Sequence, residues 1–254
     1  MAASFRRTPR GNTSTTVSPF FRKVMGLLFA MVTLTTCITT YVVVYASVQT
    51  RVWWVQQWLA YGWLVILVEV LAATLLQQYK KEYPYNYLLL LFLNLSTSIT
   101  VAVVCAVYAS RGQAALLVEA LQITAFLFGG LATFAVQSKY DFTPWNTGCL
   151  ILLLGLLWWN LAEVLFGIQT SSDLTLVGAA LFCAFVVVDI QLVLTRIGPD
   201  DAVHGAILLY LDLMNLFLYM LNLLNTNAST SSNQRGRREK KNRSSIPLYT
   251  SPVH

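Results

Sequence analysis

Seven long apolar runs set the strongest limit on what this chain can fold into. A helix needs about 20 mostly apolar residues to cross the hydrocarbon core of a bilayer, and each run is that long. Only 11% of the 254 residues are charged, against roughly 25% in a soluble domain. The sequence therefore predicts an all-α membrane protein of one domain, with seven transmembrane helices over residues 24–47, 55–77, 85–109, 114–137, 146–167, 174–195 and 203–224.

The distribution of basic residues predicts the orientation of these helices. One side of the membrane receives most of the loop and N-terminal cations, while the other receives only Arg51 and Arg111. The positive-inside rule therefore places the N-terminus in the cytosol. The basic cluster at residues 235–243 disagrees, because seven crossings put it on the luminal side. Either the last segment re-enters without crossing, or the tail is translocated regardless of its charge.

Two terminal segments differ in composition from the membrane domain at 24–224. Residues 1–23 and 225–254 are polar and basic, and they hold too little apolar surface to fold, so we expect both to be disordered. The first apolar run is long enough to span the membrane and reads as a signal anchor, not as a cleavable signal peptide.

Asp212 lies near the middle of the apolar stretch LLYLDLMNLFLYML at 208–221. A carboxylate in hydrocarbon is costly, so such residues are rare and usually functional. Asn215, Tyr219 and Asn222 follow at helical spacing, which predicts one polar stripe along the helix. Because lipid cannot satisfy polar groups, we expect the stripe to face the bundle interior and the last helix to be central.

Asp189, in the sixth run, is the predicted partner of Asp212. Asp189 and Asp212 lie at similar depths in the membrane: measured along each helix from its cytosolic end, their positions differ by only about 6 Å. Two carboxylates held together away from water cannot both ionise freely, and their protons leave in two macroscopic steps. The pair could hold a shared proton or a cation, and calcium suits an all-oxygen site. The alternative is that each aspartate is separately hydrogen-bonded and structural.

Other runs carry polar residues that could line the same interior. Glu69 lies in the middle of the second run without an obvious nearby cation, and Lys80 ends that run, where it could snorkel or pair with the acids. Two further sets lie at helical spacing in the third and fourth runs: Asn94, Thr97 and Ser98, and Glu119, Gln122, Gly129, Thr133 and Gln137.

Three segments of the membrane domain stand out: TAFLFGGLATFAVQSKYDFT (124–143), GAALFCAFVVVDIQLVLTR (178–196) and LYLDLMNLFLYML (209–221). They resemble the Bax inhibitor-1 family, also called the transmembrane Bax-inhibitor-motif or LFG family. The resemblance implies a seven-helix fold with a central last helix. It also implies a role in calcium leak across the endoplasmic reticulum, Golgi or related membranes, and in suppressing cell death. Large DNA viruses encode relatives, and this chain could be one.

The resemblance also assigns roles to individual residues. Asp189 and Asp212 match the family's pH-sensing aspartates, and Glu69 matches a glutamate of its second helix. Lys80 aligns with a basic residue that is arginine in the better-known bacterial member. Lysine lacks the planar fork of arginine, so a latch to the aspartates would be looser here.

The leading functional hypothesis is a calcium leak pathway gated by protonation of Asp189 and Asp212, with Asn215 and Tyr219 in support. A non-conducting adaptor that binds cell-death regulators is the main alternative. An intramembrane aspartyl protease is disfavoured, because Leu209-Tyr210-Leu211 precedes Asp212 in place of a glycine motif. A seven-span receptor is disfavoured by the short loops. We expect a non-enzyme without cofactors, with membrane lipids and calcium, but not nucleic acid, as partners.

Overall fold

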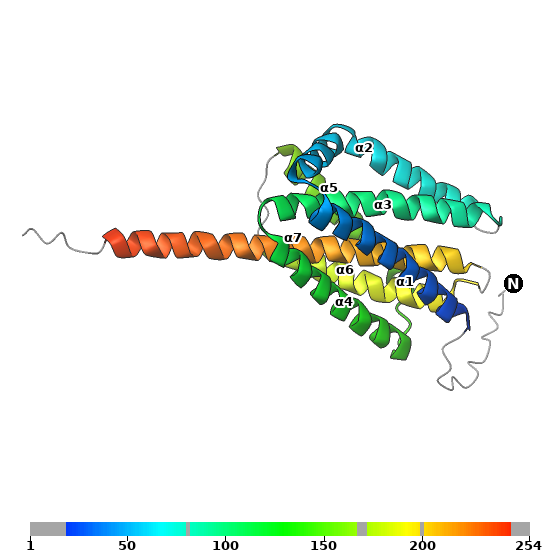
Figure 1. Ribbon diagram of the computed structural model, residues 1–254. Coiled ribbons are helices and arrows are strands. Elements are labelled where there is room, and N and C mark those ends of the chain that lie inside the picture. Colours follow the sequence, from blue (N-terminus) through cyan, green and yellow to red (C-terminus); the bar gives the residue numbers. More distant parts are fainter. Residues whose placement is uncertain (1–18, 80–81, 167–171, 199–200, 245–254) are drawn as a thin grey trace, which may run out of the picture.

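The computed structural model describes residues 19–79, 82–166, 172–198 and 201–244. In these residues the chain forms helices and no strands, and helices that follow one another in the chain run in opposite directions in a bundle (Figure 1). The helices are α1 (Pro19–Thr40), the π-helix η1 (Tyr41–Tyr45), α2 (Val48–Gln78), α3 (Tyr85–Ser110), α4 (Ala114–Gln137), the 3-10 helix η2 (Thr143–Trp145), α5 (Asn146–Phe166), α6 (Ser172–Thr195) and α7 (Ala202–Ser244).

The helices confirm the predicted all-α membrane architecture. All except α5 contain a described stretch long and apolar enough to cross a membrane. α5 has 21 residues, which at about 1.5 Å per residue gives roughly the 30 Å of a hydrocarbon core. The chain is therefore a multi-pass membrane protein.

Local sequence explains where several helices begin. α2 starts at Val48, before the expected residue 55, because the Ser47 side chain caps it by accepting a 3.2 Å hydrogen bond from the Thr50 N–H. α3 begins directly after Pro84, and Pro144 lies in η2 just before α5. Proline suits a first helical turn because its missing N–H would be unpaired there.

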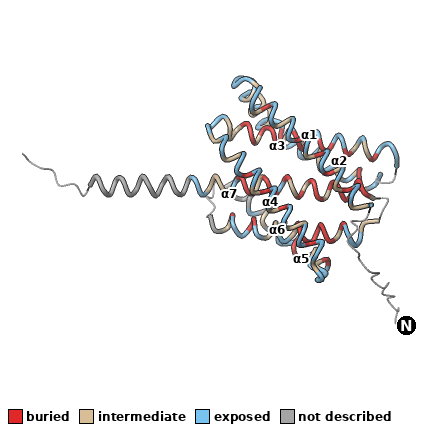
Figure 2. The backbone as a smooth tube through the Cα atoms, turned by 60° about the horizontal axis from the view of Figure 1, so that its bottom comes forward, coloured by how far each residue is buried: buried red, intermediate tan, exposed pale blue. Residues whose placement is uncertain are grey.

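α7 is the central helix of the bundle. It packs against α1, α3, α4 and α6, whereas α5 packs against α6 and η2. Figure 2 shows that buried residues gather along α3, α6 and α7, while α2 is largely exposed. A Cβ built on Gly205 would lie 3.2 Å from Val193 of α6 and 3.4 Å from Val24 of α1, so this glycine permits the close packing of three helices.

The polar stripe of α7 faces the interior only in part. Asp212 is buried, Tyr219 is half-buried, and Asn215 and Asn222 are exposed. Around the helix axis, Tyr219 lies about 20° from Asp212, Asn215 about 60° and Asn222 about 80°. The expectation that the whole stripe faces inward is therefore wrong, because the covered sector of α7 ends between Tyr219 and Asn215.

The polar face of α4 points out of the bundle, contrary to expectation. Glu119, Gln122, Gly129, Thr133 and Gln137 are all exposed. The packed face of α4 carries Ala120, Thr124, Phe128 and Ala135 instead. These smaller or apolar side chains allow closer packing against α6 and α7 than the charged face would. The third-helix set does face inward, since Asn94, Thr97 and Ser98 are buried.

α7 crosses the whole bundle and continues beyond it (Figure 1). Gln113, in the α3–α4 turn at the far end, donates a 3.4 Å hydrogen bond to Asn225 of α7. The alternative of a last segment that re-enters without crossing is therefore wrong. The helix runs to Ser244, and the disorder expected for residues 225–254 stays a prediction. Residues 1–18 and 245–254 lie outside the described residues.

Candidate functional site

Asp189 and Asp212 meet at the interface of α6 and α7. Asp189 lies six residues before the end of α6 and Asp212 ten residues after the start of α7, or about 9 Å and 15 Å from the same end of the bundle. Their side chains share a hydrogen bond. Only 5% of Asp189 and 4% of Asp212 is exposed, so the pair is shielded from bulk solvent.

A hydrogen bond between two carboxyl groups needs a proton on one of them. An ionised carboxylate can only accept hydrogen bonds, so two ionised aspartates could not bond to each other. A contact of this kind between Asp189 and Asp212 requires that at least one of the two carboxyl groups carries a proton. Removing it would leave two like charges in contact in a poorly solvated site, which is strongly unfavourable.

Asp212 also carries an unused acceptor. Its Oδ2 atom is buried and has no hydrogen-bond partner among the described residues. Positions one helical turn away are apolar and fully buried, namely Val186 and Val193 on α6 and Leu209 and Leu216 on α7. The pair thus keeps an oxygen available for a proton or a cation.

The carboxyl pair offers few ligands for a permanently bound metal ion. No group of three or more histidine, cysteine or acidic side chains comes together in the part of the chain that the structure describes. Calcium takes about 6–8 oxygen ligands, and a tightly binding protein site supplies most of them. Two aspartates alone supply fewer oxygen ligands than a closed calcium site needs.

Gln191 attaches the other side of α6 to the α4–α5 turn. Its Oε1 atom accepts a 2.7 Å hydrogen bond from the Phe142 N–H. Its Nε2 group donates to the carbonyls of Tyr140 at 2.8 Å and Ala135 at 3.4 Å. The turn between α4 and η2 is therefore fixed to the helix that carries Asp189.

A second buried polar cluster joins α1, α3 and α7 through Tyr210, which lies two residues before Asp212 on a different face of α7. The Thr35 hydroxyl lies 2.8 Å from both the Tyr210 and the Ser98 hydroxyls. Asn94 donates to the Met31 carbonyl at 3.3 Å and to Thr35 at 3.4 Å. Tyr210 is fully buried, so the cluster ties the central helix to two neighbours.

The other predicted site residues lie apart from the carboxyl pair. Glu69 of α2 accepts hydrogen bonds from Ser96 at 3.2 Å and Thr100 at 2.9 Å, both on α3. Tyr219 packs on Phe182 with a ring-centroid separation of 5.5 Å. Asn215 is exposed, so it does not reach the interior. Lys80 lies outside the described residues.

Sequence reasoning missed Gln191, Thr35 and Tyr210. Gln191 was visible as a second polar residue in an apolar run, two positions from Asp189, a spacing that puts it on a different face of α6. Threonine and tyrosine are common in membrane helices, and nothing local indicated that Thr35 and Tyr210 would meet across 175 residues of sequence.

Comparison with known proteins identifies the family. Residues 17–229 match the family described as "Inhibitor of apoptosis-promoting Bax1". Protein lifeguard 4 of Mus musculus is 33% identical over 211 residues, which cover 81% of this chain and 84% of the mouse protein. The Golgi anti-apoptotic protein of Vaccinia virus (strain Lister) is 30% identical over 81% of this chain and 84% of its own length. Bax inhibitor 1 of Schizosaccharomyces pombe is 26% identical over 81% and 75%. The chain belongs to the Bax inhibitor family of multi-pass membrane proteins.

Proposed function

We propose that this protein is a pH-sensitive leak pathway for cations, chiefly calcium, in an intracellular membrane. The observation that carries the proposal is the buried hydrogen bond between Asp189 and Asp212. It joins the central helix to α6 in a site where a carboxylate is expensive and therefore usually functional.

The proposed gate opens when the pair loses its proton. While one proton is shared, the hydrogen bond holds α6 against α7 and the cytosolic end stays closed. When both carboxyl groups ionise, their repulsion separates the helices, and the exposed oxygens then attract a cation. The leak should therefore increase as the pH rises.

The names of relatives support both a cellular location and a cellular role for the proposed leak. The vaccinia relative is named a Golgi anti-apoptotic protein, and the matched family is described as inhibiting apoptosis-promoting Bax1. We propose that the chain resides in the endoplasmic reticulum, Golgi or related membranes, of a host cell if it is viral. There it would lower stored calcium and so suppress cell death.

Purified full-length protein in calcium-loaded liposomes tests the proposal. A membrane-impermeant calcium indicator outside the liposomes reports the leak between pH 6 and pH 8. We expect a leak above protein-free liposomes that rises several-fold with pH. A leak that does not change over this range would exclude the aspartate gate. No leak at any pH would exclude conduction altogether.

A non-conducting adaptor is the second candidate, and the outward face of α4 favours it. Glu119, Gln122 and Gln137 are exposed on this spanning helix, where lipid cannot pair their polar groups. A partner helix could do so, for example that of a cell-death regulator. If liposomes show no leak, replacing Gln122 with Leu should weaken partner binding in cells while leaving the purified protein folded.

We also propose that the protein is not an enzyme. The competing assignment, an intramembrane aspartyl protease, would also use two aspartates on adjacent helices. Incubation with a fluorogenic helical peptide in detergent distinguishes the two assignments. We expect the unchanged protein to cleave the peptide no faster than the Asp189→Asn, Asp212→Asn double variant does. Cleavage by the unchanged protein that is lost in the double variant would contradict this proposal.

A further inference from the structure

Gln191 is a buried amide at the level of the carboxyl pair. It is 5% exposed and lies two residues after Asp189, which is about 3 Å further along α6. Two residues correspond to about 200° of helical rotation, so the two side chains leave α6 on nearly opposite sides. At this level α6 therefore has one polar contact with α7 and another with the α4–α5 turn.

The Gln191 contact consists of three hydrogen bonds to backbone groups. The side chain accepts from the Phe142 N–H and donates to the carbonyls of Tyr140 and Ala135. Ala135 lies in the last turn of α4, where carbonyls have no partner within the helix. One amide thus joins α6, the end of α4 and the turn, and the bonds to Phe142 and Tyr140, at 2.7 and 2.8 Å, are near the short limit for N–H···O. α6 cannot move toward the turn unless the turn moves with it.

The turn that Gln191 holds has a defined shape of its own. Asp141 accepts a 3.0 Å hydrogen bond from the Thr143 N–H and a second bond from the Thr143 hydroxyl. The Tyr140 N–H donates to the Ser138 hydroxyl at 3.2 Å. Local side-chain bonds of this kind fix a turn without help from a neighbouring helix. Gln191 is therefore attached to a structured segment.

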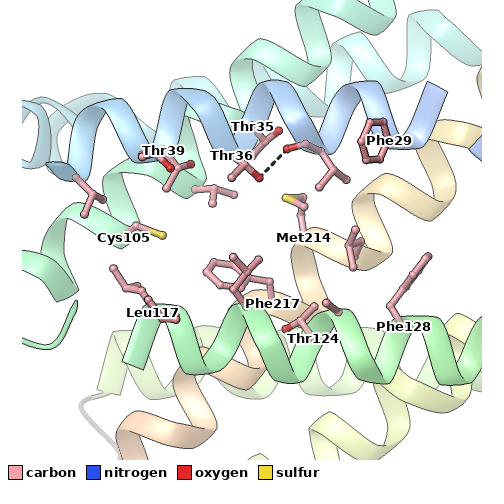
Figure 3. A pocket seen from close by; sticks show the side chains of 18 of the residues that line it. Phe29, Thr35, Thr36, Thr39, Cys105, Leu117, Thr124, Phe128, Met214 and Phe217 are labelled. Carbon is pink, nitrogen blue, oxygen red and sulfur yellow. Dashed lines mark hydrogen bonds between the residues drawn. The ribbon is translucent and has the colours of Figure 1, made fainter. Parts of the chain in front are cut away.

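α7 is tied to its other neighbours on the side away from the pair. The Tyr210 hydroxyl lies 2.8 Å from the Thr35 hydroxyl of α1. Met214 and Phe217 of α7 line a cavity between α1 and α4, and no charged side chain belongs to that lining (Figure 3). No charged group of the cavity therefore competes with α6 for Asp212.

α6 has fewer polar attachments than α7. It packs against α4, α5 and α7, while α5 packs against α6 and η2 and can follow α6. Val187, Ile190 and Val193 of α6 are buried and apolar, and hydrophobic contacts have no fixed direction. The hydrogen bonds of Asp189 and Gln191 are thus what fix this part of α6 in place.

The Gln191 contact contains no titratable group. An amide and three backbone groups do not ionise, so the contact has the same strength throughout pH 6–8. The charged side chains of the turn, Lys139 and Asp141, are exposed. The contact is therefore a constant restraint on α6, whatever the protonation of Asp189 and Asp212.

We propose that Gln191 is a positioning residue of the gate, which ties α6 to the α4–α5 turn and so keeps α6 against α7. The inference rests on the leak pathway proposed above and adds the restraint against which the carboxyl pair acts. With the contact in place, α6 can part from α7 only by carrying the turn and the end of α4 with it. Without the contact, α6 moves alone and the path opens more readily.

The leak of Gln191→Met in calcium-loaded liposomes tests the proposal. Methionine keeps a long side chain and removes the three hydrogen bonds. We expect the leak at pH 7 to rise roughly tenfold, the effect of losing one to two net hydrogen bonds. Because the contact does not titrate, Gln191→Met should also raise the leak when it is added to Asp212→Asn. Gln191→Asn is one methylene too short for the three bonds and should behave in the same way.

Two variants separate this role from a loss of stability. Thr195→Val, also on α6, removes a 2.7 Å hydrogen bond to the Gln191 carbonyl within the helix, and Tyr210→Phe weakens the bundle elsewhere. Both should leak like the unchanged protein. Hydrogen exchange measured by mass spectrometry should show a several-fold faster Phe142 amide in Gln191→Met, with α4 and α6 still protected.

The outcomes distinguish the restraint from the leak pathway itself. A normal leak from a folded Gln191→Met protein that has lost Phe142 protection would overturn the restraint and leave the leak pathway standing. An equal rise in Thr195→Val or Tyr210→Phe would also overturn it, because the effect would then come from stability. If the unchanged protein does not leak at any pH, the leak pathway fails and the restraint fails with it.

Discussion

Asp189 and Gln191 lie two residues apart on α6 and connect it to different neighbours. Asp189 hydrogen-bonds to Asp212 of α7, while Gln191 bonds to Tyr140 and Phe142 in the α4–α5 turn. Residues two apart on a helix point about 160° away from each other. One turn of α6 therefore links the carboxyl pair to the α4–α5 turn, and a movement of α6 would change both contacts.

Replacing Asp212 with asparagine should keep the proposed gate closed. An amide donates a hydrogen bond to Asp189 at any pH, so ionisation no longer breaks the contact. We expect the calcium leak of Asp212→Asn in liposomes at pH 8 to fall to the level of the unchanged protein at pH 6. Asn215→Ala, one turn away on the exposed side of α7, is the control and should keep the full pH response.

Replacing Gln191 with leucine should free the α4–α5 turn. The change removes three hydrogen bonds and leaves the Phe142 N–H without its partner, which costs about 1–3 kcal/mol. Lys139 is exposed in this turn, so trypsin cleavage after it should become several-fold faster in the folded protein. Gln137→Leu, an exposed neighbour of the same turn, should be cut at the original rate. Equal rates for both variants would show that Gln191 does not restrain the turn.

The hydroxyl cluster on α1, α3 and α7 should contribute to stability without acting in the gate. Tyr210→Phe removes the bond to Thr35, and hydrogen bonds between membrane helices are worth about 0.6–2 kcal/mol. We expect the free energy of unfolding in detergent to fall by that amount, with the leak unchanged. Thr35→Val should lower the free energy of unfolding by less in the Tyr210→Phe background than in the unchanged protein. The reason is that both substitutions remove the same hydrogen bond between Thr35 and Tyr210. Additive losses would contradict a direct contact.

The sequence predicted the elements and the carboxyl pair because both depend on local spacing. Run lengths define the spans, and counting residues from the helix ends brought Asp189 and Asp212 to similar depths. The sequence could not predict which faces are covered, because that depends on how neighbouring helices pack. Helical spacing placed Asp212 and Asn215 on one side of α7, but it does not say how far the neighbouring helices cover that side. Asn215 lies beyond the covered part and is exposed. For α4, small side chains rather than polar ones mark the packed face.

The path of α7 predicts that the two termini lie on opposite sides of the membrane. Asn225 contacts Gln113 at the end of the bundle away from the α6–α7 turn, and α7 runs on to Ser244. If the positive-inside rule holds for the N-terminus, the basic residues at 235–243 are luminal. This cluster lies within about 15 residues of Ala228, where the apolar part of α7 ends, so a luminal tail departs from the positive-inside rule, which the charge around the first helix usually, but not always, decides.

Protease protection in sealed microsomes tests this topology. An N-terminal epitope tag should be digested from outside, whereas a C-terminal tag should survive until detergent is added. Asn242-Arg243-Ser244 is a glycosylation sequon about 21 Å along the helix from Ala228, where the apolar part of α7 ends. A luminal tail should therefore give a glycosidase-sensitive shift that Asn242→Gln removes. Digestion of both tags in sealed vesicles would mean that α7 does not cross the membrane as the bundle requires.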